Sequence, residues 1–243
     1  MNFRHFLPIC LIIFSFLFAK PNADEILTQI SNHFNGLDRS MVIESNIIKK
    51  GKLKKSQKVK VQIFWPKNSE KERLTLIEFF KPKRKLGVKF WEHTFKSNLN
   101  PLKWMTLPVT GKLKDISNKK PKKNDFDFSD LQLTGETISA HQNSIIESSN
   151  ELIIESISKS NQQKKLLYID KEFNFIHKVE TFNKKNKMMK SVECIEFKIV
   201  NNYKIASKVI IEDFKKKHTV DVHITDFSFT EFSDLTIFEP KGK

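Results

Sequence analysis

Residues 73–131 carry the sequence pattern that most constrains the fold. Short runs of aromatic and branched residues recur there, and each is bounded by Pro, Gly or a charged cluster. Runs with this length, composition and type of bounding residue are typical of β-strands. The runs are 74–80, 86–91, 101–108 and 112–116, followed by an aromatic-rich segment at 124–131. The stretch predicts a meander of strands and then a short segment that covers an apolar surface.

One helix and many further strands are expected in the rest of the chain. Residues 24–34 have apolar residues at helical spacing behind Asp24, which can cap a helix, and Asn35-Gly36 ends it. From Arg39 onward the period changes to two, which is the period of a strand. Strands are expected at 40–48, 58–65, 151–158, 164–170, 175–183, 190–200, 203–214 and 218–229, with a final edge element at 232–238. Asn201-Asn202 predicts a two-residue hairpin turn, whereas 132–150 has no clear pattern.

The first residues predict a secretion signal. Arg4 precedes an apolar run over 6–18, which is shorter than the roughly 20 residues that a bilayer-spanning helix needs. Cleavage is expected after Ala19 or Ala23, so that 1–23 is the signal and 24–243 a single domain in the periplasm. The alternative is an uncleaved signal anchor. Loss of the signal leaves Cys194 as the single cysteine, which excludes an intrachain disulfide.

The chain is strongly basic, with a formal net charge of +15. In a cytosolic protein this charge would suggest nucleic acid, but in a secreted one it points to anionic envelope surfaces. We therefore expect an anionic membrane surface as a partner and no nucleic acid. The alternative is that the lysines are spread over solvated strand faces without a common target.

The sequence contains no motif for catalysis, metal or cofactor binding. It lacks a G-x-S-x-G elbow, H-E-x-x-H, C-x-x-C and a phosphate-binding loop. His218 and His223 are five apart in a strand, so they point to opposite faces. The acidic cluster at 125–130 lacks the glycine and the closing Glu of a calcium loop. We expect a protein that is not an enzyme, with no catalytic residues, no metal and no cofactor.

Aromatic residues are the positive signal. Many of the 22 Phe and the three Trp lie on expected strands whose other face is charged. A sheet with one apolar face closes on itself, packs on helices or holds an apolar ligand. Few helices are expected, so we predict a cavity of lipid size, the alternative being a barrel filled by its own side chains. The expected cavity or lid residues are Val61, Ile63, Trp65, Phe79, Phe90, Trp104, Phe126, Phe128 and Leu131.

The order of these segments resembles the LolA-like outer-membrane lipoprotein-sorting proteins. The family pattern runs I-x-F-x-x-P, then G-x-x-F, then L-P, and then a D-F-centred acidic and aromatic motif. The matching residues are Ile77, Phe79 and Pro82; Gly87 and Phe90; Leu107 and Pro108; and Asp125, Phe126, Phe128, Asp130 and Leu131. Trp91 stands where Leu is usual, and Lys123-Asn124 replaces Gly-Ser.

The resemblance implies a mainly β fold, a half-open antiparallel β-barrel of about ten or eleven strands with an N-terminal helix and short lid helices. It also implies a periplasmic carrier that binds the acyl chains of lipoproteins or another lipid and moves them towards the outer membrane. An inner-membrane transporter is then a further expected partner. The alternative is a non-catalytic envelope adaptor or sensor that uses the same fold to bind a transporter or another protein.

Overall fold

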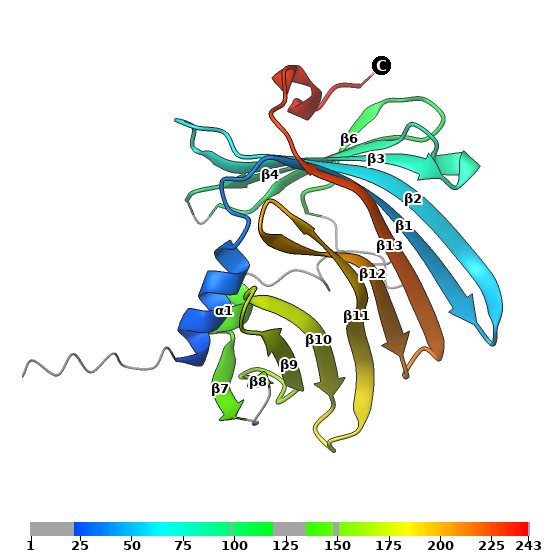
Figure 1. The fold of residues 1–243 in the computed structure, drawn as a ribbon. Helices are drawn as coiled ribbons and strands as arrows, with labels where there is room; N and C mark the ends of the chain where they lie inside the picture. The colour runs from blue at the N-terminus through cyan, green and yellow to red at the C-terminus, as the bar shows by residue number, and fades with distance from the viewer. Residues whose placement is uncertain (1–21, 98, 119–134, 148–150, 243) are drawn as a thin grey trace, which may run out of the picture.

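Thirteen strands form one antiparallel sheet that curves strongly without closing (Figure 1). The computed structural model describes residues 22–97, 99–118, 135–147 and 151–242. The strands are β1 (Arg39–Lys49), β2 (Lys52–Phe64), β3 (Lys71–Lys81), β4 (Lys89–Phe95), β5 (Leu102–Thr106), β6 (Leu113–Asp115), β7 (His141–Glu147), β8 (Leu152–Ser158), β9 (Lys164–Asp170), β10 (Phe175–Phe182), β11 (Met188–Val200), β12 (Tyr203–Asp213) and β13 (His218–Phe229). Their order is β6-β5-β4-β3-β2-β1-β13-β12-β11-β10-β9-β8-β7, so β6 and β7 are the edge strands of the sheet formed by the described residues.

The pairing of β1 with β13 joins the two halves of the chain at the centre of the sheet. Ile43 lies opposite Ile224, and Ile47 lies opposite Val220. Each half is a simple meander in which consecutive strands are neighbours. The expected half-open antiparallel architecture is therefore confirmed, with thirteen strands in the described residues where about ten or eleven were expected.

The two faces of the sheet are covered by different segments. Helix α1 (Ala23–Asn32) packs beside α2 (Gly135–Ser139) on β7–β9, through a cluster with Leu27 and Ile154 at its centre. Cross-strand pairing places this cluster on the same face as Val59 and Val222, which we call the inner face. The opposite, outer face is covered at β3 and β4 by the C-terminal segment and its 3-10 helix η3 (Leu235–Phe238). Figure 1 shows α1 and η3 on different sides of the curved sheet.

Local sequence explains the helix start and one hairpin. The Asn22 side chain accepts a hydrogen bond from the backbone nitrogen of Glu25 at 2.9 Å, and the Glu25 carboxylate accepts one from the backbone nitrogen of Asn22 at 3.1 Å. This capping box starts α1 one residue before Asp24, which was the expected cap. Asn201 and Asn202 both have positive φ, 49° and 66°, and join β11 to β12 as expected.

Three regions differ from the sequence expectation. Strand β2 begins at Lys52, because residues 52–57, which are polar except for Leu53, pair with the end of β1 although they lack an apolar alternation. The unassigned region 132–150 contains α2 and β7, and β7 is held by pairing with β8. The C-terminal segment forms η3 rather than an edge strand, because the Asp234 carboxylate accepts a hydrogen bond from the Thr236 nitrogen at 2.9 Å and caps a turn. A further 3-10 turn, η1 (Lys83–Lys85), follows β3.

Candidate functional site

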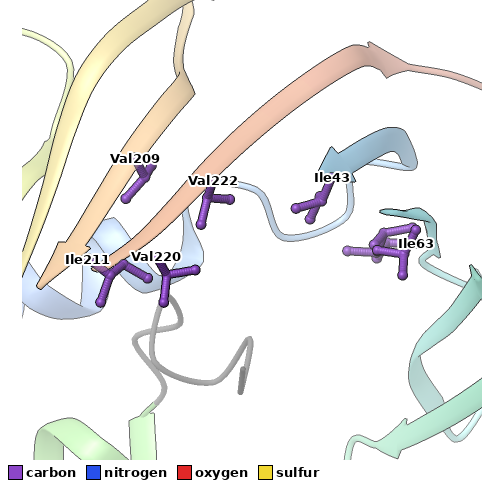
Figure 2. Packing of buried hydrophobic residues seen from close by; sticks show 8 residues of the cluster. Ile43, Ile63, Val209, Ile211, Val220 and Val222 are labelled. Atoms are coloured by element: carbon purple, nitrogen blue, oxygen red, sulfur yellow. The ribbon is translucent and has the colours of Figure 1, made fainter. Parts of the chain in front are cut away.

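The centre of the inner face is a buried apolar cluster built by four neighbouring strands. Branched side chains from β1, β2, β12 and β13 form it: Ile43, Val59, Val61, Ile63, Val209, Ile211, Val220 and Val222. Figure 2 shows this cluster from close by. Strand alternation places these residues on one face, because every second side chain points the same way. None of the cluster members or their packed neighbours comes from a helix within the described ranges.

Five of the expected site residues share this inner face. Val61 and Ile63 are buried members of the cluster, and Trp65 and Phe79 are half-buried against it. Phe90 is half-buried in β4 and lies opposite Ile77, which also packs against the cluster. The sequence therefore correctly predicted that the alternating residues of β2 share one face of the sheet with Phe79 of β3. Phe126, Phe128 and Leu131 lie outside the described residues.

Trp104 is not brought together with the other five. Phe90 lies opposite Met105, so Trp104 pairs with Trp91 and points to the outer face. There Trp104 packs against a cluster of Leu74, Leu76, Trp91 and Phe238. The register of β4 and β5 decides this, and a sequence with aromatic residues at both 90 and 91 gives no indication of which one faces inward.

A polar group, which the sequence analysis did not identify, occupies one end of the inner face. Arg39 lies opposite Ile63, and Glu92 lies opposite both Thr75 and Lys103. Arg73 contacts the Glu92 carboxylate at 3.5 Å, and Lys103 contacts it at 3.0 Å. We call Arg39, Trp65, Arg73, Glu92 and Lys103 the polar end of the inner face. The sequence contains one indication of this polar group, because arginine is rare in this chain while lysine is abundant.

Burial alters the electrostatics of Arg39. Desolvation lowers the pKa of Arg39 to about 10, and repulsion from Arg73 acts in the same direction, opposed by Asp38. The guanidinium Nη1 donates to the carbonyl oxygens of Phe34 and Leu37 at 2.9 and 3.0 Å. The Arg39 guanidinium carbon also lies 5.3 Å from the centre of the Phe34 ring. Arg39 is therefore held at the junction of α1 and β1.

A hollow of about 500 Å³ opens at the start of α1, away from the central cluster. Its lining residues are Asn22, Ala23, Asp24, Glu25, Thr28, Gln29 and Asn143. Most of these side chains are polar, and none belongs to the expected site.

The titratable residues considered from sequence do not converge. Burial raises the pKa of the Cys194 thiol, which disfavours the nucleophilic thiolate. His223 Nε2 lies 3.1 Å from Asp221 on the same strand. Within the described ranges, no group of three or more His, Cys, Asp and Glu side chains is arranged to hold a metal ion. In those same ranges, no helix has both the length and the apolar character needed to cross a bilayer.

The fold is that of the LolA-like proteins. The chain is similar to a DUF1329 family protein from Desulfovibrio piger, with a TM-score of 0.73 and 13% identity, over 89% of this chain and 95% of that one. It is also similar to a putative outer membrane lipoprotein-sorting protein domain from Vibrio parahaemolyticus, with a TM-score of 0.67 and 16% identity, over 88% of this chain and 94% of that one. A third similar structure is a LolA superfamily protein from Nitrosomonas europaea, with a TM-score of 0.63 and 13% identity, over 90% of this chain and 98% of that one.

A family model described as "Uncharacterized protein" matches residues 71–241. Because this match covers most of the chain, the protein belongs to that family. No curated protein sequence matches it. At these identities the solved structures establish the shared fold alone, and the resemblance expected from the motifs at 77–131 is confirmed at that level.

Proposed function

We propose that this protein is a periplasmic carrier that binds acyl chains of lipoproteins, or of another lipid, on its inner face and moves them towards the outer membrane. The observation that carries the proposal is the apolar centre of the inner face, on which no described helix packs. Similarity in fold to a lipoprotein-sorting domain supports it. Val61, Ile63, Trp65, Phe79 and Phe90 are the proposed contact residues. No catalytic step is part of this function.

Hydrocarbon burial alone can supply the affinity. Each buried CH₂ contributes about 0.8 kcal/mol, so a single long acyl chain provides a substantial gross driving force. Branched and aromatic side chains on a curved sheet offer a surface for such a chain without directional bonds. The half-buried Trp65 and Phe79, at the border of the buried cluster, are placed to meet it.

Native mass spectrometry tests the carrier function. Protein secreted into the periplasm is purified without detergent and examined before and after incubation with a lipidated peptide. A mass increase that equals one bound acylated molecule is expected, and its delipidated counterpart is expected not to bind. Protein that stays free of lipid under both conditions would contradict the carrier function.

A basic rim supports docking on an anionic membrane. The turns β1–β2, β10–β11 and β12–β13 lie side by side, because Ile48 pairs with Thr219 and Lys190 pairs with Asp213. Residues 49–55, 183–187 and 214–217, which we call the basic rim, contain eleven lysines and no acidic residue. Leu53 and Phe214 in the same turns are 61% and 45% exposed. Lysines around exposed apolar side chains suit the headgroup region of an anionic bilayer.

A second candidate function is that of an adaptor that binds an extended segment of a partner protein. Within the described sheet, β10 pairs with β11 only from Met188 to Glu193, so residues 195–200 pair with β12 alone. Ile195, Phe197 and Ile199 in this half-open part of β11 are 50%, 51% and 48% exposed. An open strand edge with apolar side chains can accept an added strand. Crosslinking from residue 199 in intact cells tests this function, because a carrier without a strand partner yields no specific protein adduct.

A further inference from the structure

The two arginines of the polar end lie on one surface although they belong to different strands. Arg39 in β1 is opposite Ile63 in β2, and Ile63 is opposite Thr75 in β3. Arg73 is two residues before Thr75, so it shares the inner face with Arg39, and one strand separates them. Strands are about 4.8 Å apart, so the side chains of both can reach a common ligand. Trp65 continues the inner-face row of β2 and packs against the apolar cluster.

Donors at this end of the face lack acceptors. Among the described residues, the buried Nε1 of Trp65 and the buried Nε of Arg73 have no hydrogen-bond partner. In the same part of the chain, Arg39 donates only through Nη1, to two backbone carbonyls. Within the described ranges, no carboxylate forms an ion pair with Arg39. Buried donors are nearly always satisfied in native proteins, so unmet ones at a single location call for a specific explanation.

The charge at this location is also unbalanced. Glu92 is the single carboxylate among the five residues of the polar end, and it is shared by Arg73 and Lys103. Asp38 is nearby, but its Oδ1 accepts a hydrogen bond from the backbone nitrogen of Trp65 at 2.8 Å. The lowered pKa of Arg39 reflects its burial and the proximity of Arg73. An anion placed between the arginines would relieve both the repulsion and the unmet donors.

The use of arginine instead of lysine at the polar end also indicates an anion site. The sequence has four arginines among 43 basic residues, and Arg4 lies in the expected signal. Of the remaining three, Arg39 and Arg73 are at the polar end, and Arg84 lies in η1. A guanidinium presents a planar fork of donors that matches carboxylate and phosphate groups, whereas a lysine acts as a point charge. A chain that uses lysine almost everywhere has arginine at this location.

We propose that Arg39, Arg73 and the Trp65 indole bind the anionic headgroup, a phosphate or carboxylate, of the amphiphile whose acyl chains lie on the apolar centre of the inner face. This inference rests on the proposed carrier function and specifies the class of cargo. The guanidinium groups and the indole nitrogen supply donors to the anion, while the adjacent branched and aromatic residues contact the tails. Neutral amphiphiles with the same tails make only the second set of contacts.

The test compares two lipids that differ only in the headgroup. Dipalmitoyl phosphatidic acid and dipalmitoylglycerol are presented together in neutral detergent, and the bound ratio is read by native mass spectrometry. The wild-type protein is expected to favour the phosphatidic acid by at least about tenfold, as charge-assisted hydrogen bonds imply. Arg73→Gln is expected to bring the ratio close to one while dipalmitoylglycerol still binds. Glu92 keeps Lys103 as a partner in this variant, so no carboxylate is stranded.

Arg84→Gln is the matched control, because it makes the same change at an exposed position in η1, and its ratio is expected to equal the wild-type ratio. Equal occupancy by both lipids in the wild-type protein, or a preference that persists in Arg73→Gln, would overturn the headgroup site and leave the carrier function standing. Binding of neither lipid would overturn the carrier function itself.

A separate experiment adds inorganic phosphate at millimolar concentration as a competitor. Displacement of the phosphatidic acid by inorganic phosphate would assign the site to free phosphate and overturn its role for an amphiphile.

Discussion

The indole nitrogen of Trp91 donates a hydrogen bond to the carbonyl oxygen of Ile237, 2.9 Å away, and joins β4 to the C-terminal segment. The next residue, Phe238, is fully buried and lies in ring contact with Phe64 and Phe232, with centroid distances of 5.6 and 5.0 Å. The outer face of β3 and β4 is thus closed by the protein itself.

Phe238→Ala is expected to destabilise the protein by about 3–5 kcal/mol, because it removes a fully buried aromatic ring and leaves a cavity. Urea unfolding followed by far-UV circular dichroism measures the change. Leu235→Ala, in the same 3-10 helix but 45% exposed, is the control and is expected to change stability by less than about 1 kcal/mol. Equal effects of the two variants would argue against the packing role of the C-terminal segment.

Stability is expected to fall below neutral pH because of His93. Its Nε2 lies 2.8 Å from the Phe238 carbonyl oxygen, so the neutral ring donates from Nε2. Burial lowers the pKa of His93 below its ordinary value of 6.5. The unfolded chain therefore binds more protons between the folded-state pKa and 6.5. The contribution of His93 to folding stability is complete above pH 6.5 and is lost as the pH falls from 6.5 to the folded-state pKa.

Thermal unfolding at about pH 7.5 and about pH 5.5 measures this dependence, and His93→Gln is expected to show the smaller decrease of the two proteins. Burial also lowers the pKa of His33, so part of the decrease is expected to remain in the variant. An unchanged pH profile in His93→Gln would rule out His93 as its source.

Adjacent phenylalanines provide a matched test of the inner face. Phe79 packs against the inner cluster, whereas Phe80 is the unpaired residue of a bulge between β2 and β3 and is 39% exposed. Phe79→Ser is expected to weaken acyl-chain binding by roughly tenfold or more, since a half-buried aromatic contact contributes on the order of 1–2 kcal/mol. Phe80→Ser is expected to bind as the wild-type protein does. Titration with a fluorescent fatty acid measures the binding of both variants, and equal losses would contradict the contact role proposed for Phe79.

The basic rim is expected to govern association with anionic vesicles. Replacing Lys184, Lys185 and Lys187 with Gln removes three exposed charges, each worth about 1 kcal/mol near an anionic surface, so binding should weaken by about two orders of magnitude. Co-sedimentation with phosphatidylglycerol vesicles at low salt measures this, and added salt should weaken the wild-type protein more than the variant. The control replaces Lys67, Lys96 and Lys171, which are exposed in turns at the other end of the strands. If the control weakens binding equally, the charge acts without a defined docking surface.

The position of the helix cap favours one of the two expected cleavage sites. Cleavage after Ala23 would remove Asn22, whose side chain caps α1, and Ala23, which is buried in the cluster under the helix. Loss of an Asn cap costs about 1 kcal/mol. N-terminal sequencing of the secreted protein is therefore expected to start at Lys20. A mature protein that begins at Asp24 would show that the cap is dispensable.

The sequence by itself determined the elements whose patterns are local. Alternation in 58–65 predicted which side chains of β2 share a face, and Asn201-Asn202 predicted a tight hairpin, because a two-residue period and a pair of turn residues act within a few bonds. The ordered motifs between Ile77 and Leu131 also indicated the family fold. These features needed no information about distant partners.

Only the tertiary structure decided how separate segments meet. Register between β4 and β5 turned Trp104 to the outer face, and the pairing of β1, β2 and β3 brought Arg39 and Arg73 together. Strand β7 exists because β8 supplies its hydrogen bonds, although five of its seven residues are polar. Cross-strand pairing is a long-range choice that fixes the direction of every side chain at once.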